Sequence, residues 1–505
     1  MADLPSERIP VIIGVGQIND RPADPDKGLD SFGLMLAALK AAEDDAGHPL
    51  LGELDWLGVE DQISFPDRDM HERLAAALPH PPRHREITVL PGGEGPIELI
   101  NDAALAIARG DAAVAAAVGG EAMRTAGQRA KAAAARGEPL QPDILGAAAE
   151  ALATPLMRQY RLVNPIDVYP LYENATRAAW GQSLAEAQAE SAAIWSAMSQ
   201  VAAANPNAWL RKAMTPEQIT TVDDDNRMVS FPYSKLMVAN NAVNQGAAVI
   251  MTSLAVAREL GIPEDRLIYV GRGAAAHEPD DYLRREGYTR STSIIATLSN
   301  VLAFNEITAA DLDLVELYSC FPTVPKMARR VLDWPIDKPV TAYGGLTFGG
   351  GPIGNCMMHA TAAMTEKLRA GAPDRTGLVF ANGGFATHNH AIVLSRQAPR
   401  GIDLAADYDV LADAEAAREP APQLLDNHVG PGAIESFVIP YGRDGRPRFA
   451  TIVARTLQGQ RFVAHVPGDD HQTLTMLTSP ESEPIGSLGR ASTMEDGRTL
   501  WTPAG

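Results

Sequence analysis

Cysteine is scarce in this sequence: Cys320 and Cys356 are the only two among 505 residues. This scarcity excludes a disulfide framework and indicates a reducing compartment. Long apolar runs are missing as well. The stretch Pro10–Val15 is too short for a secretory signal, and nothing approaches the roughly 20 apolar residues of a membrane-spanning helix. We therefore expect a cytoplasmic protein with no membrane span.

Positive charge is also in short supply, with 43 Lys and Arg against 63 Asp and Glu and a net charge of -20. Such an acidic chain argues against nucleic acid and anionic membranes as main partners. A local cluster, Arg124, Arg129 and Lys131, remains available to an anionic small molecule. The length predicts two to four domains.

A helix followed by a buried strand that ends in Gly-Gly occurs twice. The first copy runs from residue 97 to Gly119-Gly120, and the second from residue 359 to Gly383-Gly384. The runs Ile12–Gly16 and Ile268–Gly271 begin the two halves in the same way. We predict a duplicated α/β core of two βα halves, residues 1–263 and 264–396, with helices layered between mixed or parallel sheets.

Three further segments differ from this core in composition. Residues 121–240 are predicted to be a helical and loop-rich insertion over one face, and residues 397–423, acidic and rich in alanine and proline, a linker or solvated arm. Residues 424–505 alternate apolar and polar positions and contain the hairpin turn Asp444-Gly445. We predict a small, mostly-β barrel there, OB-like in size. It lacks the interleaved basic and aromatic residues that single-stranded nucleic acid requires.

A glycine-rich run, residues 344–355, is the most specific motif: GGLTFGGGPIGN. It resembles the Gly-Gly-x-x-x-x-Gly-His-Pro-x-Gly loop of the thiolase superfamily, with Gly351 in place of the catalytic His. Three more motifs follow the family order, at residues 119–123, 315–321 and 382–384. The chain is similar to acetyl-CoA acetyltransferases, and most similar to bacterial thiolase-like proteins with an extra C-terminal β-domain. This resemblance implies an acyltransferase of acyl-CoA and lipid metabolism, with a coenzyme A thioester as substrate or ligand.

The positions that carry catalysis in thiolases are altered here. The family uses a nucleophilic Cys, a second Cys that moves a proton, and a His and an Asn that bind the thioester oxygen. The matching positions hold a thiol-free loop at Gly92–Gly95, Tyr318 for the Asn, Gly351 for the His, and glycine at 383 or 384 for the second Cys. These changes argue against thiolysis or Claisen condensation through a cysteinyl acyl-enzyme. They favour retro-aldol cleavage or direct acyl transfer.

The remaining candidate catalytic residues are acid–base groups, oxygen donors and a thiol that the motifs bring to these loops: His359, His388, His390, Tyr318, Cys320 and Glu94. Each has a structural alternative: a satisfied core histidine, a packed ring, a buried small apolar thiol, or, for Glu94, a carboxylate that only stabilises a helix N-terminus. There the helix dipole is expected to lower the carboxyl pKa and make Glu94 a weak base.

The expected substrate-binding residues are loop glycines and one amide: Gly93, Gly350, Gly351, Asn355 and Gly384. The backbone N–H groups of Gly351 and Gly384 are predicted to polarise the thioester carbonyl, although glycine-rich turns also serve sharp chain reversals. We expect no metal, because His388 and His390 lack a third ligand, and no tightly bound cofactor. Gly14-x-Gly16 lacks the rest of a dinucleotide fingerprint.

A second function from another class remains open, a non-catalytic protein that binds a CoA thioester or acts as a scaffold. The loss of the usual catalytic residues favours it, and the surviving polar side chains favour catalysis. The assembly is expected to be a monomer or a homodimer.

Overall fold

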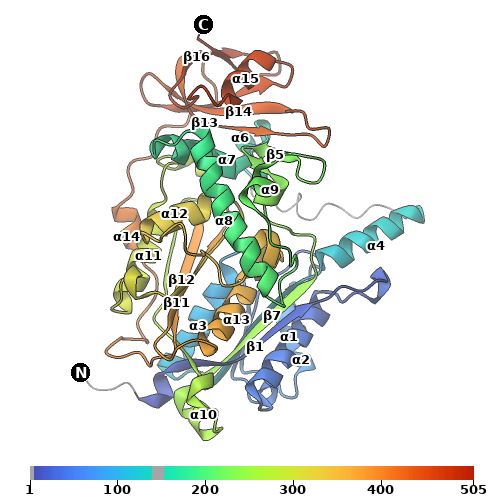
Figure 1. The fold of residues 1–505 in the computed structure, drawn as a ribbon, viewed down its shortest axis with the longest axis vertical. Helices are drawn as coiled ribbons and strands as arrows, with labels where there is room; N and C mark the ends of the chain where they lie inside the picture. The colour runs from blue at the N-terminus through green and yellow to red at the C-terminus, as the bar shows by residue number, and fades with distance from the viewer. Residues whose placement is uncertain (1–4, 139–149, 151–152, 505) are drawn as a thin grey trace.

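The computed structural model describes residues 5–138, 150 and 153–504. Residues 139–149 and 151–152 of the predicted insertion therefore lie outside the described residues. The chain forms a mixed α/β core with a β-rich C-terminal domain at one end (Figure 1). Among the described helices, none combines the length and the apolar character that crossing a membrane requires.

The first half of the core is a five-stranded arrangement in the order β3-β2-β4-β7-β1. Its strands are β1 (Pro10–Asn19), β2 (Trp56–Val59), β3 (His84–Ile87), β4 (Val114–Glu121) and β7 (Gln245–Ser253). Strand β2 runs parallel to β3 and β4, whereas β7 runs antiparallel to β4 and β1. All eight residues of β4 are buried, as expected for a strand covered on both faces.

The second half repeats this plan in the order β10-β11-β12-β8. Its strands are β8 (Ile268–Val270), β9 (Ala274–His277), β10 (Leu314–Leu317), β11 (Thr376–Gly383) and β12 (His388–Ser395). Strands β10 and β11 are parallel, β12 is antiparallel to β11, and β8 and β9 both pair with β12. Strand β1 pairs with β8 through Val11 and Ile12, which joins the halves into one ten-stranded sheet. The predicted duplication is thus confirmed, with no counterpart of β3 in the second half.

Two helices lie between the half-sheets, as the layered fold predicted. Helix α3 (Gly95–Arg109) contacts β4 on one side and β11 and β12 on the other, and α13 (Cys356–Arg369) contacts β7 and β11. The outer helices are α1 (Ser31–Ala46), α2 (Met70–Ala77), α10 (Leu254–Glu259), α11 (Thr292–Phe304) and α12 (Thr323–Val331). A Cβ atom on Gly14 or Gly16 would overlap the backbone of α1. These glycines therefore serve the close packing of strand and helix.

The insertion contributes helices above the sheets, and α8 extends from the barrel end toward them (Figure 1). Its elements are α4 (Met123–Ala135), α6 (Pro155–Gln159), α7 (Pro165–Ala179), α8 (Leu184–Ala204), α9 (Pro216–Thr220), β5 (Met228–Phe231) and β6 (Tyr233–Ser234). A buried ion pair, Lys326 Nζ to Glu173 Oε1 at 2.5 Å, ties α7 to α12. Tyr233 donates to the other oxygen of Glu173, at 2.9 Å. The second hydrogen bond offsets part of the cost of burying two charges.

The C-terminal domain is a closed five-stranded barrel, as predicted. Its strands pair in the cycle β13-β14-β15-β17-β16-β13. They are β13 (Gly430–Pro440), β14 (Phe449–Thr456), β15 (Arg461–Pro467), β16 (Leu488–Thr493) and β17 (Thr499–Pro503), with α15 (His471–Thr478) beside them. Closure leaves the barrel without a free edge.

The barrel is joined to the core by main-chain pairing. Strand β13 pairs with β5 of the insertion at Ile439 and Phe231, so the barrel sheet continues into the core. Residues 397–423 differ from the expected solvated arm. Ala275 of β9 exchanges backbone hydrogen bonds of 2.8 Å with Tyr408 and Val410, and α14 (Leu411–Ala416) packs on α11. The acidic and alanine-rich composition suggested solvation, but backbone pairing with β9 fixes the segment.

A buried guanidinium also spans this joint. Arg461 of β15 has a fully buried side chain and donates to both oxygens of Glu435, at 2.8 and 2.6 Å. It also donates to the carbonyls of Leu283 and Arg285 in the core, at 2.7 and 2.6 Å. One side chain therefore satisfies acceptors on both sides of the joint.

We expect Arg461→Met to lower the free energy of unfolding by about 3 kcal/mol or more, because it leaves buried acceptors without their donor. Urea denaturation followed by tryptophan fluorescence measures this loss. Arg498→Met, which removes a surface pair with Asp496, is the control and should leave the midpoint nearly unchanged. Equal shifts for the two variants would contradict the role assigned to Arg461.

Candidate functional site

The carboxyl group of Glu94 lies between two glycines that come from opposite halves of the chain. A Cβ atom on Gly92 or on Gly383 would overlap this carboxyl group. These are the loop where the family resemblance places the nucleophilic Cys and the turn where it places the second Cys. The space beside both glycines is filled by one carboxyl group, which a side chain at either position would displace.

A second carboxyl group, that of Glu60, holds the Gly92–Gly95 loop in place. Glu60 follows β2, is 1% exposed, and accepts a 3.0 Å hydrogen bond from the Gly92 N–H and a 3.2 Å bond from the Thr88 hydroxyl. A Cβ atom on Gly95 or Gly354 would overlap its oxygens. Burial, and then the nearby charge of Glu94, raise the pKa of Glu60 well above its usual value. Glu60 thus fixes the loop and discourages a second charge beside it.

Burial controls the acidity of Glu94. The Glu94 Oε2 atom is buried without a hydrogen-bond partner in the described part of the chain. Burial raises the pKa of Glu94 to about 7, and the charge of Glu98 contributes in the same direction. The expectation of a lowered pKa was wrong, because desolvation outweighs the helix dipole and the carboxyl group makes no capping hydrogen bond. A carboxyl group with this pKa is matched to acid–base work near neutral pH.

Helix α3 carries two more carboxyl groups at the following turns. Burial raises the pKa of Glu98 to about 7 and that of Asp102 to about 6. Residues four apart lie on one helix face, so Glu94, Glu98 and Asp102 form a row. Tyr408, from the segment before the barrel, donates to Asp102 at 2.7 Å. The row explains why each charge raises the pKa of the group before it.

Tyr318 faces the Glu94 loop from the end of β10. Its backbone N–H donates to Phe380 at 3.1 Å, and its hydroxyl lies against Gly93, where a Cβ atom would overlap it. The residue is 7% exposed, and burial raises its phenol pKa well above the usual value. The phenol therefore stays protonated and keeps an O–H group that can donate.

Cys320 follows Tyr318 by two residues, and its surroundings do not activate the thiol as a nucleophile. Burial raises the pKa of its thiol to about 12, although a hydrogen bond with Tyr169 lowers it in part. A thiol needs its anion to react, so Cys320 remains inert at neutral pH. Tyr169 of α7 also stacks on Phe321, with ring centroids 4.7 Å apart. This group of side chains forms one wall of the site.

The two candidate histidines of β12 differ in their surroundings. His388 is half-exposed beside Gly384, with its Nε2 atom 3.7 Å from Asp280 Oδ1. Burial lowers its pKa, and Asp280 opposes that effect. His390 faces Tyr408 instead, with ring centroids 5.9 Å apart, and burial lowers its pKa to about 3. At that pKa His390 is neutral near pH 7, and its acid–base role stays a prediction.

His359 is a core residue of α13. It is fully buried, with Nδ1 3.0 Å from Gln17 Oε1 and its ring 5.9 Å from that of Tyr343. Burial lowers its pKa to about 3. A dry core disfavours the imidazolium ion, and the expected proton transfer by His359 stays a prediction that its burial does not favour.

The glycine-rich loop is shaped mainly by packing. The N–H of Gly351 already donates to the Asn240 carbonyl at 3.0 Å, so the expectation that it polarises a thioester was wrong. Gly350, at φ 114°, packs on Gln245 and accepts from the Tyr343 hydroxyl at 2.8 Å. Asn355 is fully buried against Gly119 and Glu60. Gly350 and Gly351 are held by packing and backbone bonding, whereas both polar atoms of the Asn355 amide are buried without a partner among the described residues.

Two backbone donors remain beside Glu94. In the described part of the chain, the N–H groups of Gly93 and Gly384 donate to no protein acceptor. Gly384 adopts φ 61° and is exposed, as befits a left-handed turn. With the Tyr318 hydroxyl, which lies against Gly93, they are the donors that the loops carrying Glu94 and Gly383 leave available.

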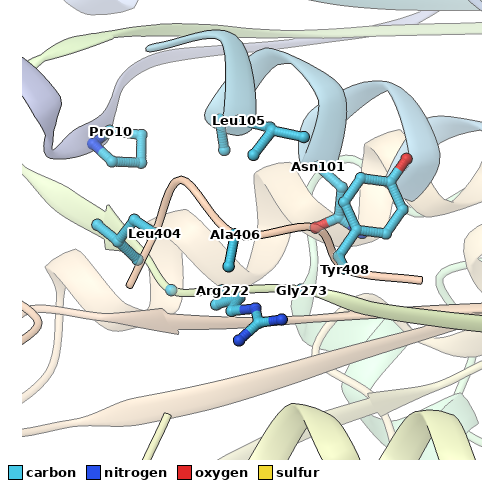
Figure 2. A pocket seen from close by; sticks show the side chains of 10 residues that line it. Pro10, Asn101, Leu105, Arg272, Gly273, Leu404, Ala406 and Tyr408 are labelled. Carbon is cyan, nitrogen blue, oxygen red and sulfur yellow. The ribbon is translucent and has the colours of Figure 1, made fainter. Parts of the chain in front are cut away.

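Two cavities lie elsewhere in the core, and Glu94 lines neither of them. One of about 10 Å³ lies between α3 and the segment before the barrel, lined by Asn101, Leu105, Arg272 and Tyr408 among others (Figure 2). A larger one of about 610 Å³ lies along residues 395–402. Within the described residues, no group of three or more His, Cys, Asp or Glu side chains is placed to hold a metal ion. The candidate site is thus defined by side-chain chemistry.

Comparison with known proteins shows what this chain is similar to. Residues 413–497 match the family model for the additional C-terminal domain of thiolase-like protein type 1. A monomeric SCP2-thiolase like protein type 1 from Mycobacterium smegmatis is 28% identical, with 99% of both chains covered and a TM-score of 0.82. These matches support a thiolase-like fold with an additional C-terminal domain.

Other similar proteins match a smaller part of this chain. A curated acetyl-CoA acetyltransferase from Methanothermobacter thermautotrophicus is 27% identical over 188 residues, 34% of this chain and 47% of that protein. The chain thus spans about half the length of that relative. Human mitochondrial 3-ketoacyl-CoA thiolase, solved in complex with CoA, covers 78% of this chain at 16% identity and a TM-score of 0.58. The last match shows the fold alone.

Three side chains of the site were not predicted. Glu60 ends a buried apolar strand, an unusual place for a charge that could have marked it as a candidate. Asn382 belongs to the motif at residues 382–384, and Tyr169 lies in the insertion, where no motif marks it. Tyr169 reaches the site from a helix more than 200 residues before the Gly383–Gly384 turn, to which it donates at 3.0 Å. No local pattern carries that contact.

The raised pKa of Glu94 predicts a pH-dependent stability. From about pH 4.5 to pH 7 the folded carboxyl group keeps a proton that the unfolded one has lost, so stability falls as pH rises through this range and levels off above it. We expect Glu94→Gln to stabilise the protein by about 1–3 kcal/mol at pH 8.5 and by almost nothing at pH 5. Thermal unfolding at both pH values measures the difference. Glu259→Gln, at an exposed position of α10, is the control; a gain in Glu94→Gln that is equal at both pH values would contradict the assignment.

Proposed function

We propose that this protein binds a coenzyme A thioester beside Glu94 and acts on it by proton transfer, without a cysteinyl intermediate. The observation that carries the proposal is the Glu94 carboxyl group, which fills the space between Gly92 and Gly383. Its pKa of about 7 lets it accept and return a proton at neutral pH. The CoA complexes among the fold relatives support the ligand class.

A retro-aldol cleavage fits this arrangement. The Glu94 carboxylate takes the proton of a β-hydroxyl group, the bond between Cα and Cβ breaks, and a carbonyl compound leaves. The electron pair passes to the thioester as an enolate, whose oxygen is stabilised by the Tyr318 O–H and the Gly384 N–H. Return of the proton from Glu94 to Cα gives the shortened acyl thioester. An aldolase complex among the fold relatives, at 18% identity and a TM-score of 0.58, supports the plausibility of this chemistry on the fold. Direct acyl transfer uses the same base and donors.

The second function is binding of a CoA thioester without turnover. One observation favours it: both cysteines are buried, and burial raises the pKa of each thiol. In this case the same loops hold the ligand, and the barrel presents the complex to another protein.

Calorimetric titration with CoA and acetyl-CoA, followed by turnover assays with acetyl-CoA and 3-hydroxyacyl-CoA esters, tests the proposal. We expect Glu94→Gln to bind within about threefold of wild type and to lose about 10²- to 10⁴-fold in kcat. Tyr318→Phe should lose about 10- to 10³-fold, because one donor to the oxygen is removed.

Glu259→Gln serves again as the matched surface control and should leave kcat and KM unchanged. Binding by wild type with no turnover of any ester would favour the non-catalytic function. No binding at millimolar ligand would contradict both functions. A His388→Ala, His390→Ala double variant that keeps its turnover would exclude both histidines from the chemistry.

A further inference from the structure

A row of buried hydrogen bonds leads away from the Gly383–Gly384 turn. The Tyr169 hydroxyl lies 3.2 Å from Asn382 Oδ1 and 3.0 Å from the Gly384 carbonyl oxygen and can donate its one proton to either, and Asn382 Nδ2 donates to Asn389 Oδ1 at 2.9 Å. Both asparagines are fully buried, and they pair across β11 and β12. Asn382 immediately precedes the glycine turn, so its orientation bears directly on the turn.

The row continues across β12 to helix α11. Asn389 Nδ2 donates to Ser293 Oγ at 2.8 Å, and Ser293 Oγ donates to Glu278 Oε1 at 2.9 Å. The same carboxylate oxygen accepts from the Ser293 N–H at 2.9 Å and from the Ser291 hydroxyl at 2.9 Å. Glu278, which is 5% exposed, thereby caps the N-terminal end of α11.

An ionised Glu278 sets the direction of the first bond in this row, because a carboxylate can only accept and the Ser293 hydroxyl donates to it. Ser293 Oγ then accepts from the Asn389 amide. Two backbone carbonyls favour the same amide orientations, since Asn389 Nδ2 lies 3.4 Å from the Thr387 oxygen and Asn382 Nδ2 lies 3.4 Å from the His388 oxygen. The Glu278 carboxylate and these carbonyls together orient the row.

Arg418 supplies the charge opposite Glu278. Its guanidinium lies 3.1 Å from Glu278 Oε2 and also donates to the His277 carbonyl at 3.0 Å. Burial raises the pKa of Glu278, but the Ser293 N–H, Arg285, Ser291 and Arg418 together lower it below the usual value. Arg418 lies within residues 413–497, the part that matches the additional C-terminal domain.

We propose that Arg418 is a positioning residue through which the additional C-terminal domain orders the Gly383–Gly384 turn of the site. It acts through its 3.1 Å ion pair, which anchors the Glu278 carboxylate to which Ser293, Asn389 and Asn382 are linked in sequence. The proposal rests on the proposed function for its catalytic consequence, since that turn holds the Gly384 donor and the contact with Glu94. Its structural consequence, the order of the turn, is independent of any turnover.

Amide hydrogen exchange of the full-length protein, followed by mass spectrometry, tests the inference. We expect Arg418→Met to speed exchange in a peptide that covers residues 382–387 by about tenfold or more, while a barrel peptide covering 450–456 is unchanged. Arg290→Met is the matched control, because Arg290 also contacts the segment before the barrel, at the Ala417 carbonyl and Glu419, but does not touch Glu278. It should leave the 382–387 peptide unchanged.

A second variant separates charge from packing. Arg418→Met with Glu278→Gln removes both charges and keeps an oxygen that accepts from Ser293, so exchange should return to within about twofold of wild type. Arg418→Lys should fall between wild type and Arg418→Met, and serves if the latter does not fold. Unchanged exchange in Arg418→Met, an equal effect of Arg290→Met, or no recovery in the double variant would overturn the proposal. A kcat loss of about tenfold with unchanged KM in Arg418→Met is expected if the protein turns over CoA esters; absence of turnover in wild type would count against the proposed function and leave the exchange result to decide this inference.

Discussion

The close approach of two glycines to one carboxyl group is the constraint on which the site depends. Gly92 and Gly383 come from different halves of the duplicated core, and only residues without a Cβ atom leave room for Glu94 between them. The same crowding removes water from the carboxyl group and raises its pKa. The close packing around Glu94 therefore explains both the need for glycine at positions 92 and 383 and the raised pKa of the carboxyl group.

Residues around this carboxyl group act by holding backbone in place. Glu60 binds the Gly92 N–H from the end of β2, and Tyr169 binds the Gly384 carbonyl from the insertion. The duplicated halves supply the two glycine turns, and the restraints come both from the first half, through Glu60, and from the insertion, through Tyr169. A shared fold can in this way keep its turns and exchange its chemistry.

Local pattern predicted much of the architecture. The recurring Gly-Gly strands predicted the duplication, and alternation after residue 424 predicted the barrel. The fates of the histidines were not predictable in the same way. His359 and His390 lie in motif positions, but their burial depends on side chains such as Gln17 and Tyr408 from distant segments. Sequence spacing reports which residues share a loop, and desolvation is decided by the whole fold.

The pairing of β5 with β13 has a consequence for how the chain is made. Phe231 meets its partner Ile439 only after roughly 200 further residues have been synthesised. Until then the β5–β6 hairpin has an unsatisfied edge, and it emerges from the ribosome long before the strand that covers it. The β5–β6 hairpin therefore gains this strand partner only near the end of translation. A nascent chain that stalls before β13 leaves the edge of β5 unpaired, and such an edge is a site where chaperones can bind.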